Sequence, residues 1–191
     1  MVLSTDSRKK FHFKGGGMRK ENFGHGYVLD PCCGGKSFYF DKEEAENVVD
    51  FIDKRRGTFT YGDRKVTVDP DEVGDFTNLN DTSVCLCEYN LVVFDPPHLT
   101  RAGEGSYLRE KYGVLPHDWE KELSRGFSEC FRTLCDGGVL AFKWSDYDIP
   151  FQKVIKLAPY RPLFGDRRGR TRWTFFVKCE ALKKEIDHSN A

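Results

Sequence analysis

The sequence lacks any long apolar run. Its 191 residues are 39% hydrophobic and 31% charged, and no stretch approaches the roughly 18 consecutive apolar residues that a membrane-spanning helix requires. The N-terminal letters MVLSTDSRKKFHFKGGG also contain no apolar core of signal-peptide length. The sequence therefore predicts a cytoplasmic protein with no membrane partner, and its length suits one globular domain.

Metal-ligand spacing, internal repeats and an excess of charge of either sign are lacking too. Lysine plus arginine and aspartate plus glutamate number 30 each, so no overall field attracts nucleic acid, and any such contact must be local. The seven cysteines are odd in number and show no paired Cys-x-x-Cys spacing. This pattern favours reduced thiols over a disulfide framework or a metal site, so we expect no metal.

Glycines are present after the first apolar segment, in YVLDPCCGGKSFYFDK (27–42). A P-loop needs a glycine five residues before Gly35 so that backbone N–H groups surround phosphates. That position is Asp30, whose carboxylate would repel a triphosphate. A nucleotide hydrolase is therefore a minor alternative, and Lys36 and Ser37 are interpreted as the start of a helix. The dinucleotide fingerprint fails as well, because the glycines are adjacent.

An acid at a strand end, followed by a turn of small residues, suits a cofactor that carries positive charge and hydroxyls. S-adenosylmethionine, with its ammonium, sulfonium and ribose groups, is such a cofactor.

Strand and helix patterns alternate along the chain. Apolar runs predict strands, and a charged helix is expected to begin in KSFYFDKEEAENV. An amphipathic helix is expected after Asp118, its N-cap. The expected segments are strands at 27–30, 48–53, 90–98 and 139–144, a loop or hairpin at 54–67, a strand edge ending at Asp75, a helix at 118–134, a short helix near 150–158, and a closing strand pair around the basic turn DRRGRTR. This order predicts an α/β fold with a mostly parallel twisted sheet, helices on both faces and a C-terminal antiparallel hairpin.

Four aspartates follow or end predicted strands. They are Asp30, Asp53, Asp75 and Asp95. Ligands of open parallel sheets bind beyond the carboxyl ends of the strands, so these acids are expected to form a row along one rim.

Two motifs resemble a known family. LDPCCGG (29–35) looks like the first motif of the class I S-adenosylmethionine-dependent methyltransferases, and VFDPPH (93–98) looks like the Asp-Pro-Pro-Tyr motif of their nucleic-acid amino-methyltransferases. With DEVGDFTNL, GFSECFRTL, GGVLAFKW and PLFG, the match covers about 27–178 and is similar to small methyltransferases of phages and prophages. The resemblance implies a single Rossmann-like methyltransferase domain at 23–180, between a basic flexible arm at 1–22 and a tail at 181–191.

The resemblance also implies positions for S-adenosylmethionine. The methionine part would face the turn after the first strand, the ribose the end of the second, and the adenine the segment GDF. The implied residues are Asp30, Cys32, Gly34 and Gly35 for methionine, Asp53 for the ribose hydroxyls, and Asp75 with Phe76 for adenine. Asp50 is an alternative to Asp53 if the second strand ends earlier.

The Asp-Pro-Pro motif implies the catalytic groups. Asp95 and the carbonyl of Pro96 would accept the hydrogens of a target amine, and Pro97 completes the rigid turn. His98 replaces the usual tyrosine or phenylalanine that stacks on a flipped base. Lys143, which follows the fifth strand, is either a substrate contact or a surface lysine.

The expected function is methyl transfer to an exocyclic amino group of a base, of the N6-adenine or N4-cytosine type, with DNA or RNA as partner. The alternatives are an RNA or protein-amide methyltransferase, or a cofactor-binding module that has lost catalysis, as the departure at His98 suggests. The chain has no room for a separate recognition region, so the target would be read by a lid at 100–118, the basic arm and DRRGRTR.

Overall fold

The computed structural model describes residues 26–185 apart from 87, 102, 104–106, 108 and 110–112. The predicted basic arm and parts of the predicted lid lie outside the described residues. Within the described ranges, no helix combines the length and apolar composition needed to cross a membrane.

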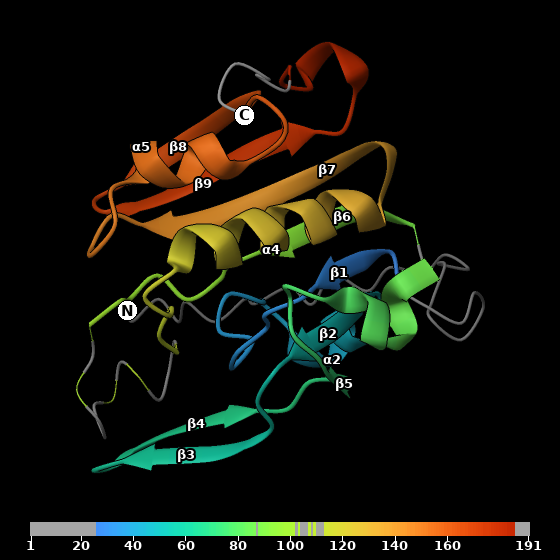
Figure 1. The fold of residues 1–191 in the computed structure, drawn as a ribbon. Helices are drawn as coiled ribbons and strands as arrows, with labels where there is room; N and C mark the ends of the chain where they lie inside the picture. Colours follow the sequence, from blue (N-terminus) through green and yellow to red (C-terminus); the bar gives the residue numbers. More distant parts are fainter. Residues whose placement is uncertain are drawn as a thin grey trace, which may run out of the picture.

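A seven-stranded sheet runs through the molecule in the order β5-β2-β1-β6-β7-β9-β8 (Figure 1). The strands are β1 (Val28–Asp30), β2 (Val49–Asp53), β5 (Glu72–Val73), β6 (Tyr89–Phe94), β7 (Leu134–Ser145), β8 (Phe164–Arg168) and β9 (Thr171–Val177). The first five in the spatial order pair in parallel, and β9 is antiparallel to both β7 and β8. The predicted α/β class with its C-terminal antiparallel hairpin is confirmed.

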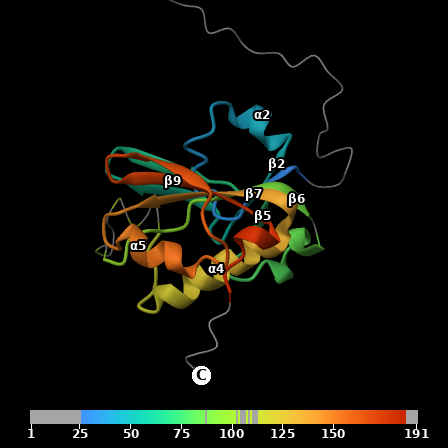
Figure 2. The same cartoon turned by 90° about the horizontal axis from the view of Figure 1, so that it is seen from above.

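Helices cover both faces of the sheet. Figure 2 shows α2 (Lys42–Glu46) on one side, and α4 (Trp119–Thr133) and α5 (Phe151–Val154) on the other. The described residues also form four short 3-10 helices: η1 (Leu79–Asp81), η2 (Ser83–Leu86), η3 (Ile155–Leu157) and η4 (Glu180–Leu182).

The helix α4 packs an apolar stripe on the sheet, as its period predicts. The ring of Phe127 is buried and lies 5.4 Å from the ring of Phe94 and 4.9 Å from that of Phe142. Asp118 occupies the N-cap position, but its side chain makes no capping hydrogen bond. The position of the cap was therefore predicted correctly, whereas its side-chain bond was not.

The helix between β1 and β2 is shorter than the sequence predicts. It begins after Asp41, whose side chain accepts a hydrogen bond from the N–H of Glu44. Lys36 has a φ of 53°, in the left-handed region that a helix cannot contain. The interpretation of Lys36 and Ser37 as a helix start is therefore wrong.

A hairpin, rather than a helix, connects β2 to β5. It consists of β3 (Gly57–Tyr61) and β4 (Arg64–Val68), which form a separate two-stranded sheet. Figure 1 shows the hairpin projecting away from the main sheet. A Cβ on Gly35 would lie 3.3 Å from Cγ1 of Val66, so the hairpin packs closely on the turn after β1.

Gly126 offers a test of the packing between α4 and the sheet. An alanine inside a helix normally stabilises it by about 0.5–1 kcal/mol relative to glycine. Here a Cβ would lie 2.7 Å from the ring of Phe76 and 2.8 Å from that of Phe94. We expect Gly126→Ala to lower the free energy of unfolding by about 1–3 kcal/mol, because the added methyl group overpacks the core.

Urea unfolding would measure this effect. The control is Ser128→Ala on the exposed face of the same helix, which should change the free energy of unfolding by no more than about 0.5 kcal/mol. A Gly126→Ala protein as stable as the wild type would contradict the packing described here.

Candidate active site

A cavity of about 490 Å³ opens at the carboxyl ends of the parallel strands. Its volume is within the usual range of small-molecule sites, about 300–1,000 Å³. The segments that follow β1, β2, β5 and β6 supply its floor, and β4, Tyr107 and Gly113 supply further walls. The lining residues are Pro31–Gly35, Ser37, Phe38, Lys42, Asp53–Arg55, Lys65–Thr67, Phe76, Asp95–His98, Tyr107 and Gly113.

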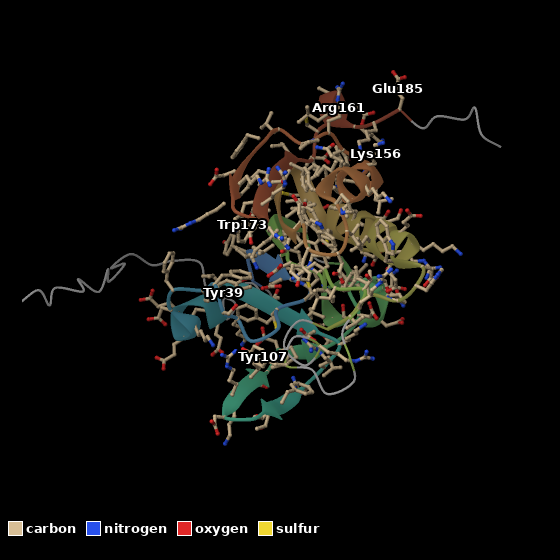
Figure 3. The ribbon with its side chains drawn as sticks, turned by 90° about the vertical axis from the view of Figure 1, so that its left-hand side faces the viewer. Tyr39, Tyr107, Lys156, Arg161, Trp173 and Glu185 are labelled. Atoms are coloured by element: carbon tan, nitrogen blue, oxygen red, sulfur yellow. The ribbon has the colours of Figure 1, made fainter. Side chains whose placement is uncertain are left out.

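The hairpin and the segment after the Asp-Pro-Pro motif meet over this cavity. The guanidinium carbon of Arg64 lies 5.0 Å from the centre of the ring of Tyr107. Figure 3 shows Tyr107 beside the β3–β4 hairpin. The hairpin was predicted only as a loop or short hairpin, and its part in the cavity wall was not foreseen.

Asp30 lies beneath the turn rather than on the cavity wall. It is fully buried, and its carboxylate accepts hydrogen bonds from the hydroxyl of Tyr39 at 2.9 Å and from the N–H of Cys32 at 3.3 Å. The pKa of Asp30 is raised to about 7, chiefly by burial. The two hydrogen bonds oppose the rise, and the carboxylates of Asp95 and Asp53 add to it. Asp30 therefore titrates near neutral pH.

Asp53 ends β2 and lines the cavity. Its Oδ2 accepts a hydrogen bond from the N–H of Gly34 at 2.9 Å, and its Oδ1 accepts from the N–H of Arg55 at 2.9 Å. Gly34 has a φ of 50°, which glycine adopts without strain. By contrast, Asp50 lies earlier in β2 and accepts a hydrogen bond from the hydroxyl of Tyr89. Asp53, rather than Asp50, is the acid at the strand end.

Two lysines stabilise the turn after β1. The ammonium of Lys36 lies 3.0 Å from Oε1 of Glu46 and 4.1 Å from the centre of the ring of Phe51. That of Lys42 donates to the carbonyl of Gly35 at 2.8 Å. Lys36 thus links the turn to α2 and is not among the described residues that line the cavity.

Asp75 is partly exposed and is not among the described residues that line the cavity, whereas its neighbour Phe76 is. Oδ1 of Asp75 accepts hydrogen bonds from the N–H and the hydroxyl of Thr77, both at 2.9 Å. The strand β5 ends at Val73, two residues before Asp75. Asp75 therefore stabilises the turn after β5, and the buried ring of Phe76 packs against that of Phe94 at 5.5 Å.

Asp95 is paired with Lys143. The ammonium of Lys143 lies 2.5 Å from Oδ2 of Asp95. It also lies 5.4 Å from the centre of the ring of Phe38 and 6.0 Å from that of Trp173. Lys143 is therefore neither a free surface lysine nor a member of the described cavity lining, and it holds the Asp95 carboxylate in place.

His98 lies on the cavity wall, with its ring centre 6.2 Å from that of Trp144. Burial lowers the pKa of His98, and Lys143 lowers it further, whereas Asp95 and Asp148 oppose the shift. The imidazole therefore favours the neutral form near pH 7, in which one ring nitrogen donates and the other accepts.

The structure brings most of the predicted site residues to one cavity. The predicted residues on its wall are Cys32, Gly34, Gly35, Asp53, Phe76, Asp95, Pro96, Pro97 and His98. Among the described residues, no group of three or more histidine, cysteine or acidic side chains is arranged to hold a metal ion.

The buried carboxyl of Asp30 predicts a pH-dependent stability. Between about pH 4 and pH 7, the unfolded carboxyl is ionised while the folded carboxyl keeps its proton. The stability that this group contributes is present below pH 4 and is lost as the pH rises through about 7. Asp30→Asn removes the titration. As the pH rises across this window, the free energy of unfolding of the wild type should therefore fall relative to that of Asp30→Asn by about 1.4 kcal/mol per pH unit.

Urea unfolding of both proteins at several pH values would measure the difference. Parallel curves of stability against pH would show that Asp30 keeps an ordinary pKa.

No protein-family model and no curated protein matches the chain. Among solved structures, the chain is similar to the PH0226 protein from Pyrococcus horikoshii OT3, with a TM-score of 0.51 and 15% identity over 84% of this chain and 85% of that chain. It is also similar to a TehB-like SAM-dependent methyltransferase from Corynebacterium glutamicum, with a TM-score of 0.48 and 14% identity over 80% of this chain and 79% of that chain. The likeness to PH0226 shows that the two chains share the Rossmann-like fold described above.

Proposed function

We propose that the protein is an S-adenosylmethionine-dependent methyltransferase that acts on an exocyclic amino group of a nucleic-acid base. One observation carries the proposal: the turn Pro31–Gly35 and the motif Asp95–His98 line the same cavity of about 490 Å³. A methyl transfer requires cofactor and acceptor to meet, and these two segments are the ones whose motifs resemble the cofactor and acceptor sites of amino-methyltransferases.

The residues around the turn fit S-adenosylmethionine. Each carboxylate oxygen of Asp53 can accept two hydrogen bonds, and Oδ2 is engaged by the N–H of Gly34. Asp53 can therefore accept a ribose hydroxyl as well. Phe76 lies on the cavity wall as an apolar residue for the adenine, and Asp53 supplies negative charge close to a cationic ligand. When bound, the cofactor supplies an activated methyl group.

On the acceptor side, Asp95 would receive a hydrogen of the target amine and disperse the positive charge that develops on its nitrogen. The ion pair with Lys143 orients the Asp95 carboxylate and engages its Oδ2. An amine can therefore approach Oδ1. The neutral His98 offers a ring against which a base can stack without adding a second positive charge.

Charge on the cavity wall supports a nucleic-acid substrate. Lys42, Lys54, Arg55 and Lys65 line the cavity, against the two acids Asp53 and Asp95. Phosphates of a strand would be attracted to such a wall even though the chain as a whole is neutral.

A cofactor-binding module without turnover is the second candidate. The pairing of Asp95 with Lys143 favours it, because the ammonium already neutralises the carboxylate that would stabilise the reacting amine. Methyl-transfer assays over DNA, RNA and protein pools decide between the two functions, because the module would bind S-adenosylhomocysteine and transfer nothing.

The cofactor site can be tested by binding of S-adenosylhomocysteine. Asp75 is partly exposed and adjoins Phe76 on the cavity wall. We expect its carboxylate to accept a hydrogen bond from the adenine amine, so Asp75→Ala should weaken this binding by about ten- to a hundredfold, since a hydrogen bond to a charged group contributes roughly 1.5–3 kcal/mol. Thr77→Val is the matched control, because it removes the hydroxyl that bonds to Asp75 and keeps the carboxylate.

Isothermal titration calorimetry would measure both variants. Equal losses in Asp75→Ala and Thr77→Val would mean that Asp75 acts only through the turn, and unchanged affinity in both would remove Asp75 from the site.

The proposed role of Asp95 separates turnover from cofactor binding. Because the carboxylate would act mainly in the transition state, Asp95→Ala should lower the methyl-transfer rate by about a hundred- to a thousandfold and leave the affinity for S-adenosylhomocysteine unchanged. Single-turnover assays with the substrate pool that gives methyl transfer would measure the rate. A folded Asp95→Ala protein that transfers methyl at the wild-type rate would exclude this mechanism.

A further inference from the structure

A second cavity, of about 390 Å³, lies on the other side of the segment that follows the Asp-Pro-Pro motif. His98 lines the first cavity, and Thr100 and Arg101 line the second. One short stretch of chain therefore separates the two spaces. The residues that line the second cavity are Thr100, Arg101, Pro116, His117, Trp119, Asp148, Ile149, Pro150 and Lys153.

The partition between the cavities is held by the loop after β7. Oδ2 of Asp148 accepts hydrogen bonds from the N–H of Thr100 at 2.7 Å and from the N–H of Arg101 at 3.2 Å. In the same loop, the carbonyl of Ile149 accepts a hydrogen bond from Nε1 of Trp144 at 3.0 Å. The ring of Trp144 also contacts that of His98. Trp144 therefore connects His98 on the wall of the first cavity with Ile149 on the wall of the second.

The lining of the second cavity combines an aromatic ring with positive charge. Trp119 is partly exposed at the start of α4, and Arg101 and Lys153 are exposed. His117 adds a third nitrogen-bearing side chain. Burial opposes the ionisation of Asp148, but the N–H groups of Thr100 and Arg101 hold its pKa below the usual value. The Asp148 carboxylate is thus hydrogen-bonded to the backbone of Thr100 and Arg101. Arg101 and Lys153 give the cavity lining more positive than negative side chains.

We propose that the second cavity binds the nucleotide adjacent to the target nucleotide, with its base against Trp119 and its phosphate near Arg101 and Lys153. Aromatic rings bind bases of single strands by stacking, and lysine or arginine binds the phosphates. The proposal rests on the proposed function, because it assumes that the target base enters the first cavity beside His98. Both cavities are then filled by one strand that passes over the partition.

Lys153 and Lys156 allow a matched test. Both are exposed and lie three residues apart, but Lys156 is not among the described residues that line the cavity. Fluorescein-labelled single-stranded DNA and RNA octamers of mixed sequence serve as probes, and anisotropy titrations with saturating S-adenosylhomocysteine give the dissociation constants. Repeating them at several salt concentrations gives the slope of log K against log salt.

We expect Lys153→Ala to weaken octamer binding and to reduce the salt slope by about one, because one phosphate contact is lost. Lys156→Ala should change neither quantity. Trp119→Leu should weaken binding by about five- to a hundredfold, and Trp119→Phe, which keeps a ring, should retain most of the affinity. If Trp119→Leu fails to fold, Lys153→Ala and Trp119→Phe still decide the test.

Equal effects of Lys153→Ala and Lys156→Ala, or a wild-type protein that binds no octamer, would overturn the inference. The inference would also be overturned if Lys153→Ala bound the octamers with the same slope of log K against log salt as the wild type. Calorimetry with S-adenosylhomocysteine distinguishes failure of this inference from failure of the proposed function. If the protein binds S-adenosylhomocysteine but the octamer experiments contradict the nucleotide site, the methyltransferase proposal still stands. Absence of cofactor binding would instead refute the proposed function itself.

Discussion

The parallel pairing of β1 with β2 and β6 is the constraint on which the rest of the structure depends. The register places Asp30 beside Phe51 of β2 and Leu29 beside Val92 of β6. Strands that run in the same direction end at the same edge, so acids that follow them gather there whatever their separation in the sequence. Gathering them has an electrostatic cost, because Asp53 and Asp95 both raise the pKa of Asp30. The turns and side chains around the rim compensate for this repulsion.

The compensation differs from acid to acid. Asp53 is paired with Arg55, and Asp95 with Lys143. Asp30 receives hydrogen bonds from neutral donors, the hydroxyl of Tyr39 and the N–H of Cys32. Hydrogen bonds from neutral groups do not offset complete burial, which is why its pKa is about 7. The rim therefore holds two carboxylates with cationic partners on the cavity wall, and beneath them a third that can change its charge near neutral pH.

Much of the fold was predictable because its signals are local. Apolar runs that end in Asp-Pro identified β1 and β6, and the apolar period identified α4. The misjudged parts depend on contacts between distant segments. Lys36 has a left-handed backbone and its ammonium contacts Glu46 of α2, and the letters KSF predict neither feature. Asp75 is not in the cavity lining, and β5 ends at Val73, two residues before the strand end that the sequence predicts. The pairing of Asp95 with Lys143 follows from the register of Phe94 with Phe142 across β6 and β7, which no sequence pattern supplies.

The floor and the outer wall of the cavity come from segments that differ in how firmly the main sheet fixes their positions. Its floor belongs to strand ends whose positions the sheet fixes, so the groups proposed to act on the cofactor and the amine are held rigidly. Its outer wall belongs to the β3–β4 hairpin and to Tyr107, whose ring is contacted by Arg64 of the hairpin. The hairpin strands pair with each other and not with the main sheet. Residues of the hairpin can change without altering strand register. In the proposed function, the outer wall and the neighbouring cavity would therefore select the substrate and the rim would carry the transfer chemistry, so the two could vary separately in one fold.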